Sequence, residues 1–340
     1  MIPPCDSALS RAGDDIAVLH RKDTLLADNF ADRLLKAIRT RRTPACVGID
    51  PVYGRLPAEI AEQRDMNDEM DAEAALDAVL EFCRRVIRIV APLVPAVKIN
   101  SAFFERYYWE GIEGYYELVQ EAAERDLIVI GDCKRADIGS SAEMYARAHL
   151  ADPDFSNLDD FVGPDAVTVN PYFGLDGVKP FIDIAKEDGK GLFVLVRTSN
   201  PSGAAIQDIP GADGFCLCES VARQVTEWAG GEGMIGTAGY GCVGAVVAAR
   251  DREMAMKLRA MLPHSIFLVP GYGTQGATAE DVAACFKSDG TGAIVNASRS
   301  ILYAYEDMKY VERFSSEWEE CIRQACKDFV ADLAKSVRIA

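Results

Sequence analysis

The sequence predicts a single (β/α)8 TIM barrel with an N-terminal extension and an added C-terminal helix. Short apolar runs alternate with amphipathic helical segments through most of the chain. This alternation indicates a parallel sheet, because each helical crossover returns the next strand in the same direction. Eight such units favour a closed barrel over an open doubly wound sheet, and no GxGxxG motif follows the first strand to favour a dinucleotide fold. Polar side chains also cluster where the strands end.

Each predicted strand is a short apolar run bounded by turn residues. The strands are expected at 45–49, 95–99, 127–131, 165–169, 191–196, 244–249, 266–269 and 293–297. Apolar residues at helical spacing predict helices at 30–38, 71–91, 113–124, 140–149, 176–187, 216–229, 251–261 and 278–286, followed by a final helix that carries Phe314 to Leu333.

The ends and the first long connection are assigned separately. Residues 1–27 show no strong periodicity and are predicted to be an extension, so the barrel domain is placed at 28–340 without a second domain. Asp28 is expected to cap the first helix. Residues 53–70, which combine glycine, proline and many charges, are predicted to form a loop or short insertion.

The bulk composition excludes several classes of protein. The chain has 340 residues, 49% hydrophobic content and a net charge of -17, which argues against nucleic acid or an anionic membrane surface as its main partner. No apolar run is long enough to span a membrane, and the N-terminus lacks a secretory signal. Ten scattered cysteines fit a reducing cytosol, so a cytoplasmic location is expected.

The cysteines and histidines do not suggest a metal site. Cys216 and Cys218 form a lone C-x-C without any CxxC pair, and the chain has three histidines. These numbers disfavour zinc, so no metal is expected. His20, His149 and His264 are interpreted as surface or packing residues, since none follows a predicted strand.

The stretch from 127 to 141 holds the main candidate catalytic residues. Asp132 and Lys134 follow a buried strand and share one face in extended chain, whereas Asp137 comes after a turn. A structural ion pair is the simplest explanation. However, polar residues follow other predicted strands too, and barrel active sites lie on that rim. The residues at strand ends are Asp50, Lys98, Asp132, Lys134, Asn170, Ser199 and Arg299.

Two stretches near the end of the barrel suit a phosphate group. One is the glycine-containing segment 270–278, and the other is Asn296 to Ser300. Loops after strands seven and eight commonly bind phosphate in such barrels, where backbone N–H groups can approach an anion. Arg299 would add a forked, permanently charged donor, and Gln275 could bridge the phosphate and the rest of the ligand.

At these motifs the chain resembles the orotidine 5'-phosphate decarboxylase family. The segment Asp132-x-Lys134-x-x-Asp137-Ile138 is similar to the family signature, and the similarity extends in order from about residue 28 to 305. The other matching motifs begin at Val47, Val97, Val194, Val269 and Ser298. The resemblance is greatest to the branch with a longer segment after the first strand and a stretch like Asn170-Pro-Tyr-Phe-Gly174.

The resemblance implies conversion of orotidine 5'-phosphate to UMP and CO2, without a cofactor, by a homodimer whose two sites are shared. It places Lys98, Asp132 and Lys134 in one subunit's site and Asp137 in that of its partner. Substrate contacts implied by the resemblance are Asp50 with the ribose, Ser199 with the pyrimidine, Gln275 and Arg299 with the phosphate, Ile138 and Ser141 across the interface, and additionally Asn170, Pro270 and Ser298. Ser298 departs from a glycine common in other branches.

Lys134 is expected to protonate C6 of the pyrimidine after CO2 leaves. Two alternatives stay open. One is a Mg-dependent phosphosugar aldolase or synthase barrel of the same superfamily, in which these carboxylates would serve the ion. The other is a non-catalytic nucleotide-binding barrel. Residues 107–109 (Tyr-Tyr-Trp) suit either helix packing or dimer contacts.

Overall fold

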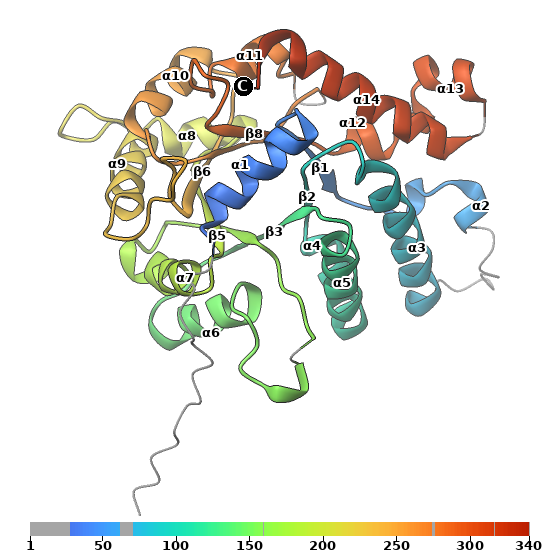
Figure 1. Ribbon diagram of the computed structural model, residues 1–340, viewed down its shortest axis with the longest axis horizontal. Coiled ribbons are helices and arrows are strands. Elements are labelled where there is room, and N and C mark those ends of the chain that lie inside the picture. The colour runs from blue at the N-terminus through green and yellow to red at the C-terminus, as the bar shows by residue number, and fades with distance from the viewer. Residues whose placement is uncertain (1–27, 62–70, 159, 274–275, 316, 340) are drawn as a thin grey trace, which may run out of the picture.

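A closed parallel barrel of eight strands forms the centre of the molecule, which confirms the predicted fold class (Figure 1). The computed structural model describes residues 28–61, 71–158, 160–273, 276–315 and 317–339. The predicted extension at 1–27 lies outside these residues. The strands are β1 Ala45–Ile49, β2 Ala96–Ile99, β3 Ile128–Arg135, β4 Ala166–Val169, β5 Gly191–Arg197, β6 Val243–Val247, β7 Phe267–Val269 and β8 Ala293–Ala297.

The barrel closes where β1 pairs with β8, with Cys46 opposite Asn296. Strands β1, β2, β4, β6, β7 and β8 are buried along their whole length. Helices cover the outside of such a sheet and side chains fill its interior, so both faces of a strand must be apolar. This burial explains why the strands appear in the sequence as continuous apolar runs.

Helices surround the strands (Figure 1). The longer ones are α1 Phe30–Arg41, α3 Ala72–Val90, α5 Tyr108–Ala123, α6 Gly139–His149, α7 Leu175–Glu187, α9 Leu217–Ala229, α10 Arg252–Met261 and α14 Trp318–Ser336. Shorter pieces are η1 Tyr53–Arg55, α2 Ala58–Ala61, α4 Ala102–Glu105, η2 Ser156–Leu158, η3 Pro201–Gly203, α8 Ala204–Gln207, α11 Ala279–Ala283, α12 Arg299–Leu302, η4 Ala304–Glu306 and α13 Met308–Phe314. Among the described residues, no helix combines the length and apolar composition that a membrane crossing requires.

Several predicted boundaries were wrong, and the predicted final helix is divided, since Phe314 ends α13 and Trp318 begins α14. Asn29, not Asp28, caps α1, because the Asn29 side chain accepts a hydrogen bond from the N–H of Ala31. Strand β3 does not end at Gly131 but continues to Arg135, through an irregularity in its pairing with β4. Helix α5 begins at Tyr108, five residues before the first position predicted from its periodicity.

Helix α1 crosses the end of the barrel where the strands begin, and Figure 1 shows it in front of them. Its Phe30 ring packs edge-on against Phe193, with ring centroids 5.9 Å apart. A Cβ on Gly191, the first residue of β5, would lie 2.2 Å from that ring, so only glycine leaves room for Phe30. Asp32 adds polar contacts, because its carboxylate accepts hydrogen bonds from the N–H groups of Thr237 and Ala238.

We expect Phe30→Ala to lower the free energy of unfolding by about 3–5 kcal/mol, the usual cost of emptying a buried phenylalanine site. Denaturant unfolding followed by circular dichroism measures this change. Lys36→Ala, an exposed substitution in the same helix, serves as the control and should change stability by about 0.5 kcal/mol or less. A similarly small effect of Phe30→Ala would show that α1 does not close the barrel.

Candidate active site

The carboxyl ends of the strands surround a cavity of ≈ 410 Å³. Most of the site residues expected from the sequence line it together, although they come from six different strands or the loops that follow them. They are Asp50, Lys98, Asp132, Lys134, Ser199, Pro270, Ser298 and Arg299. Gln275 lies outside the described residues.

Asp132 is held between two ammonium groups at this cavity. Lys98 donates from Nζ to Asp132 Oδ2 at 2.5 Å, and Lys134 donates from Nζ to Oδ1. The side chains of Lys98 and Asp132 are 8% and 7% exposed, whereas that of Lys134 is 48% exposed. Lys98 is therefore a fixed internal charge, while Lys134 can reach a ligand in the cavity. Asp50 extends the array, with Oδ1 4.0 Å from Lys98 Nζ.

The charges in this array determine its protonation. Burial alone would raise the pKa of the Asp132 carboxyl, but the ammonium groups of Lys98 and Lys134 outweigh burial and hold that pKa well below its usual range. Burial would likewise lower the pKa of Lys98, but Asp132 and then Asp50 hold it above the usual lysine value. Both Asp132 and Lys98 are therefore charged at neutral pH.

Thr168 of β4 positions both Asp132 and Lys134. Its hydroxyl donates to Asp132 Oδ1 at 2.8 Å and accepts a hydrogen bond from the backbone N–H of Lys134 at 3.0 Å. Lys134 has φ 46°, a left-handed conformation that costs energy for a residue with a side chain. The Thr168 contact supports that conformation, which directs the Lys134 side chain back to Asp132. Thr168 could not be singled out from the sequence, because a threonine in an apolar strand is common.

A second part of the cavity offers hydrogen-bond acceptors. Asp50 Oδ1 and Asn296 Oδ1 are buried and have no hydrogen-bond partner among the described residues. Buried acceptors are normally satisfied, so this pair suits the hydroxyl groups of a ligand. The sequence placed Asn296 in a segment suited to phosphate and did not indicate that its side chain offers a buried acceptor. Its amide donates to Ser298 Oγ at 3.2 Å, and a Cβ on Gly48 would lie 1.9 Å from that oxygen, so glycine is needed for this close approach.

The loop after β7 faces Arg299 across the same cavity. Pro270, Gly271 and Tyr272 line it, and the Tyr272 hydroxyl donates to Asp332 of α14. The C-terminal helix thus holds this loop from behind. Backbone groups of a glycine-containing loop together with a guanidinium form a suitable phosphate site.

Four expected site residues lie outside the cavity of their own chain. Asp137, Ile138, Ser141 and Asn170 are not among its lining residues. Ile138 is 55% exposed, and Asp137 accepts a hydrogen bond from the N–H of Ile138 at 2.8 Å. Asn170 accepts one from the N–H of Tyr172 at 3.1 Å, a local turn contact. A single chain therefore does not bring these four side chains to the Asp132 array.

We expect Lys98→Met to raise the pKa of Asp132, since burial would then be opposed by one ammonium instead of two. The folded pKa lies below the unfolded value of about 3.9, so ionised Asp132 stabilises the fold above about pH 4, and this contribution is lost as the pH falls through the folded pKa. Carbon-13 spectra of aspartate-labelled protein, assigned with Asp132→Asn, should show an ionised wild-type Asp132 down to about pH 3.

The matched control is Lys179→Met, which removes an exposed lysine paired with Asp183 on α7. It should leave the Asp132 titration unchanged. An Asp132 midpoint in the ordinary aspartate range in the wild type, or one that Lys98→Met does not raise, would contradict the electrostatic account.

Comparison with known proteins identifies the family to which this arrangement belongs. The model of the orotidine 5'-phosphate decarboxylase / HUMPS family matches residues 46–314. An orotidine 5'-phosphate decarboxylase of Rhodopirellula baltica is 42% identical over 87% of this chain and 96% of its own. One from Caldicellulosiruptor bescii is 41% identical over 82% and 91%. The structure of Leishmania donovani OMP decarboxylase, 27% identical, superposes with a TM-score of 0.63 over 90% of this chain and 98% of that one. The chain belongs to the orotidine 5'-phosphate decarboxylase / HUMPS family.

Proposed function

We propose that this chain decarboxylates orotidine 5'-phosphate to UMP and CO2 in pyrimidine synthesis. The observation that carries the proposal is the Lys98–Asp132–Lys134 array at the rim of a cavity large enough for a nucleotide. The relatives that cover nearly the whole chain are named for this reaction.

The array suits a reaction that leaves a carbanion at C6 of the pyrimidine. Ionised Asp132 would repel a substrate carboxylate beside it, and this repulsion ends when CO2 leaves. The ammonium of Lys134 would stabilise the developing negative charge and then donate a proton to C6. Lys98 would remain buried and hydrogen-bonded to Asp132, so that this carboxylate stays charged and in place. No step requires a cofactor to take up the electron pair.

The rest of the cavity would hold the nucleotide. Asp50 and Asn296 offer acceptors for ribose hydroxyls, and the loop at 270–272 with Arg299 suits the phosphate. Ser199 would contact the pyrimidine from the segment after β5. The phosphate is remote from C6, so its binding energy would serve to hold the reacting group against the array.

Lys134→Ala should reduce turnover by at least about 10²–10⁴-fold, the contribution of a general acid, while UMP still binds. A spectrophotometric decarboxylation assay measures turnover, and calorimetry measures UMP affinity. Lys179→Ala, an exposed lysine on α7, is the control and should leave both values unchanged. Full turnover by Lys134→Ala would exclude Lys134 as the proton donor.

The family name also covers phosphosugar chemistry, which makes the Mg-dependent barrel the main rival. In that reading Asp50 and Asp132 would bind the ion. Both oxygens of Asp132 already accept hydrogen bonds from lysine ammonium groups, which disfavours it as a metal ligand. The same assay discriminates, since a decarboxylase of the proposed kind keeps its activity in EDTA. The assay also separates the proposal from a non-catalytic nucleotide-binding barrel.

We further propose that two copies of the chain associate and share their active sites. Asp137, Ile138 and Ser141 lie outside their own cavity, at the start of α6, where a partner could receive them. An apolar groove of ≈ 1090 Å³ runs between α5, α6 and the segment that follows α6 as far as Phe161. Trp109 and Phe155 beside it are 76% and 67% exposed, more apolar surface than a lone chain usually shows.

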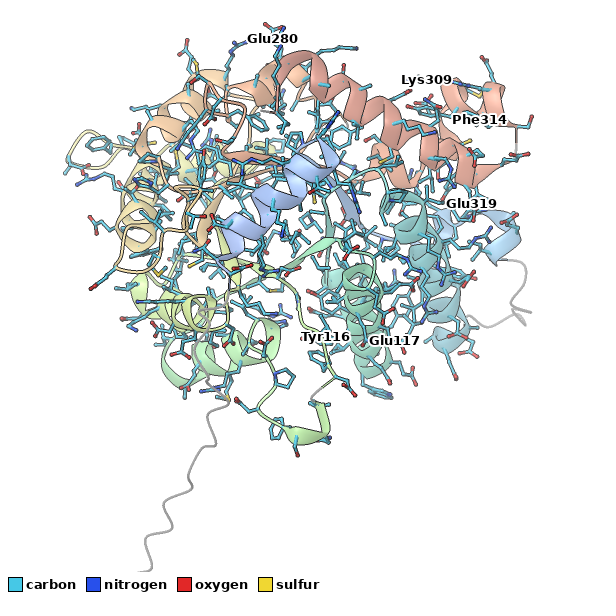
Figure 2. The ribbon with its side chains drawn as sticks, in the orientation of Figure 1. Tyr116, Glu117, Glu280, Lys309, Phe314 and Glu319 are labelled. Atoms are coloured by element: carbon cyan, nitrogen blue, oxygen red, sulfur yellow. The ribbon has the colours of Figure 1, made fainter. Side chains whose placement is uncertain are left out.

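The groove lies on one side of α5. Tyr116 points toward α6, where its hydroxyl donates to the Ala148 carbonyl oxygen, whereas Glu117 pairs with Arg84 of α3 on the other side (Figure 2). Tyr108 and Trp109 at the start of α5 therefore face a surface that a second copy would cover. This favours the dimer-contact interpretation of residues 107–109 for Tyr108 and Trp109, while Tyr107 is buried.

Mixing inactive Asp132→Ala and Asp137→Ala dimers should restore activity. A hybrid dimer has one site with both defects and one intact site, so an equal mixture recovers about one quarter of the wild-type sites. The decarboxylation assay measures recovery, after native mass spectrometry with one variant labelled with nitrogen-15 has shown that subunits have exchanged. No recovery despite exchange would mean that Asp137 acts within its own chain.

The described cysteines form no disulfide. Together with the proposed biosynthetic role, these free thiols support the proposal that the protein works in a reducing compartment, the cytoplasm.

A further inference from the structure

We propose that Asp208, Cys216, Cys218 and Met254 form a binding site for a thiophilic metal ion, separate from the catalytic cavity. The sequence disfavoured a zinc site because it has a lone C-x-C, no CxxC pair and three histidines. The fold supplies further ligands from two other segments. Asp208 follows α8, Cys216 and Cys218 begin α9, and Met254 lies in the first turn of α10.

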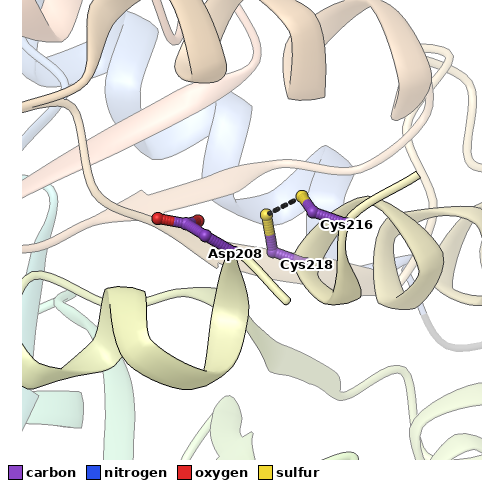
Figure 3. Close-up of side chains that lie close together, drawn as sticks. All are labelled: Asp208, Cys216 and Cys218. Atoms are coloured by element: carbon purple, nitrogen blue, oxygen red, sulfur yellow. Dashed lines mark hydrogen bonds between the residues drawn. The ribbon is translucent and has the colours of Figure 1, made fainter. Parts of the chain in front are cut away.

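The donor atoms already lie close together. Cys216 Sγ is 3.3 Å from Cys218 Sγ, and one oxygen of Asp208 lies within 4.8 Å of both sulfurs (Figure 3). Met254 Sδ is 3.9 Å from Cys218 Sγ. Around a tetrahedral ion with metal–sulfur bonds of about 2.3 Å, two sulfurs lie about 3.8 Å apart. The thiols therefore need to separate only slightly to accept an ion between them.

The donor set selects the chemical class of the ion. Two thiols and a thioether are soft ligands, which favour zinc, cadmium or monovalent copper over magnesium or calcium. Cys218 is 1% exposed, and among the described residues its thiol contacts the sulfur atoms of Cys216 and Met254 and has no hydrogen bond to oxygen or nitrogen. Cys216 is the N-cap residue of α9.

Binding must release protons. Metal ions bind cysteine in its deprotonated form. A divalent ion replaces both thiol protons, forms two metal–sulfur bonds and passes two protons to solvent, with no change in oxidation state. The affinity for the ion should therefore rise with pH.

The site adjoins the segment that carries Ser199. Both oxygens of Asp208 accept hydrogen bonds from Arg197 at the end of β5. Gln207, the neighbour of Asp208, accepts a hydrogen bond from the N–H of Thr198 at 3.0 Å, and Thr198 lines the catalytic cavity next to Ser199. An ion that recruits Asp208 must displace Arg197, which is feasible because the Asp208 side chain is 45% exposed, whereas Asp132 is 7% exposed and fixed between two lysines. Metal binding is thus expected to disturb the pyrimidine contact, a consequence that rests on the proposed function.

Cadmium titration of the full-length chain tests the site directly. A Cys5→Ser background removes the one cysteine outside the described residues. We expect one cadmium ion per chain with cadmium–thiolate charge-transfer absorption in the ultraviolet, and tighter binding at higher pH. Cys216→Ser or Cys218→Ser should abolish this signal, and Asp208→Asn should weaken binding.

Cys326→Ala, which removes a buried thiol of α14, is the matched control and should retain the full signal. Circular dichroism and metal-free turnover establish that each variant is folded. A charge-transfer signal that survives both Cys216→Ser and Cys218→Ser, or the absence of stoichiometric binding to the parent chain, would overturn the proposal.

The expected effect of the metal on the Ser199 segment can be measured separately, by enzyme kinetics. Cadmium should raise the KM for orotidine 5'-phosphate in the parent chain and have no effect in Cys216→Ser. An equal effect of cadmium on both proteins would refute the link to the Ser199 segment. If the chain proved not to be a decarboxylase, the absorption titration would still decide the metal site, so the two failures are distinguishable.

Discussion

The buried carboxylate of Asp132 is the constraint on which the rest of the site depends. An isolated charge with 7% of its side chain exposed would be costly, and removal of either partner from a buried pair typically destabilises a protein by about 3–5 kcal/mol. Asp132 is stable because Lys98 and Lys134 approach its two oxygens from opposite directions. These ammonium groups come from β2 and β3, so only strand pairing in the correct register can assemble the array.

The closed barrel provides that register and places the remaining groups around the array. Strand β4 contributes Thr168, which holds both the Asp132 carboxylate and the strained backbone of Lys134. The closure of β1 on β8 brings Asp50 and Asn296 together, although 245 residues lie between them in the chain. At the opposite end of the strands, α1 fills the barrel entrance with Phe30. The stability of the barrel and the geometry of the site are therefore linked.

The sequence was sufficient for the features that depend on local pattern. Apolar runs predicted all eight strands. Because parallel strands place equivalent ends at one edge, the positions of Asp50, Lys98, Asp132 and Arg299 at strand ends predicted that they lie around one cavity. Thr168 escaped notice, and Asn296 was named only as the start of a phosphate segment, because both lie inside strands, where only the three-dimensional register gives them a polar neighbour. The predicted cap at Asp28 and the predicted end of β3 at Gly131 were wrong for a similar reason. Local contacts of Asn29 set the start of α1, and a pairing irregularity with β4 lets β3 continue. Met254 and Asp208 could not be linked to Cys216 without the fold.

We expect one nucleotide to span the Lys98–Asp132–Lys134 array and the 270–272 loop, and Asp137 of a second chain to complete the active site. A crystal structure of the protein with UMP bound tests this most directly. The account predicts C6 beside Lys134 Nζ, ribose hydroxyls on Asp50, the phosphate against Arg299 and the 270–272 loop, and the partner chain's copy of Asp137 at the edge of the same cavity. A nucleotide bound away from Lys134, or an Asp137 that faces solvent in every copy, would contradict it.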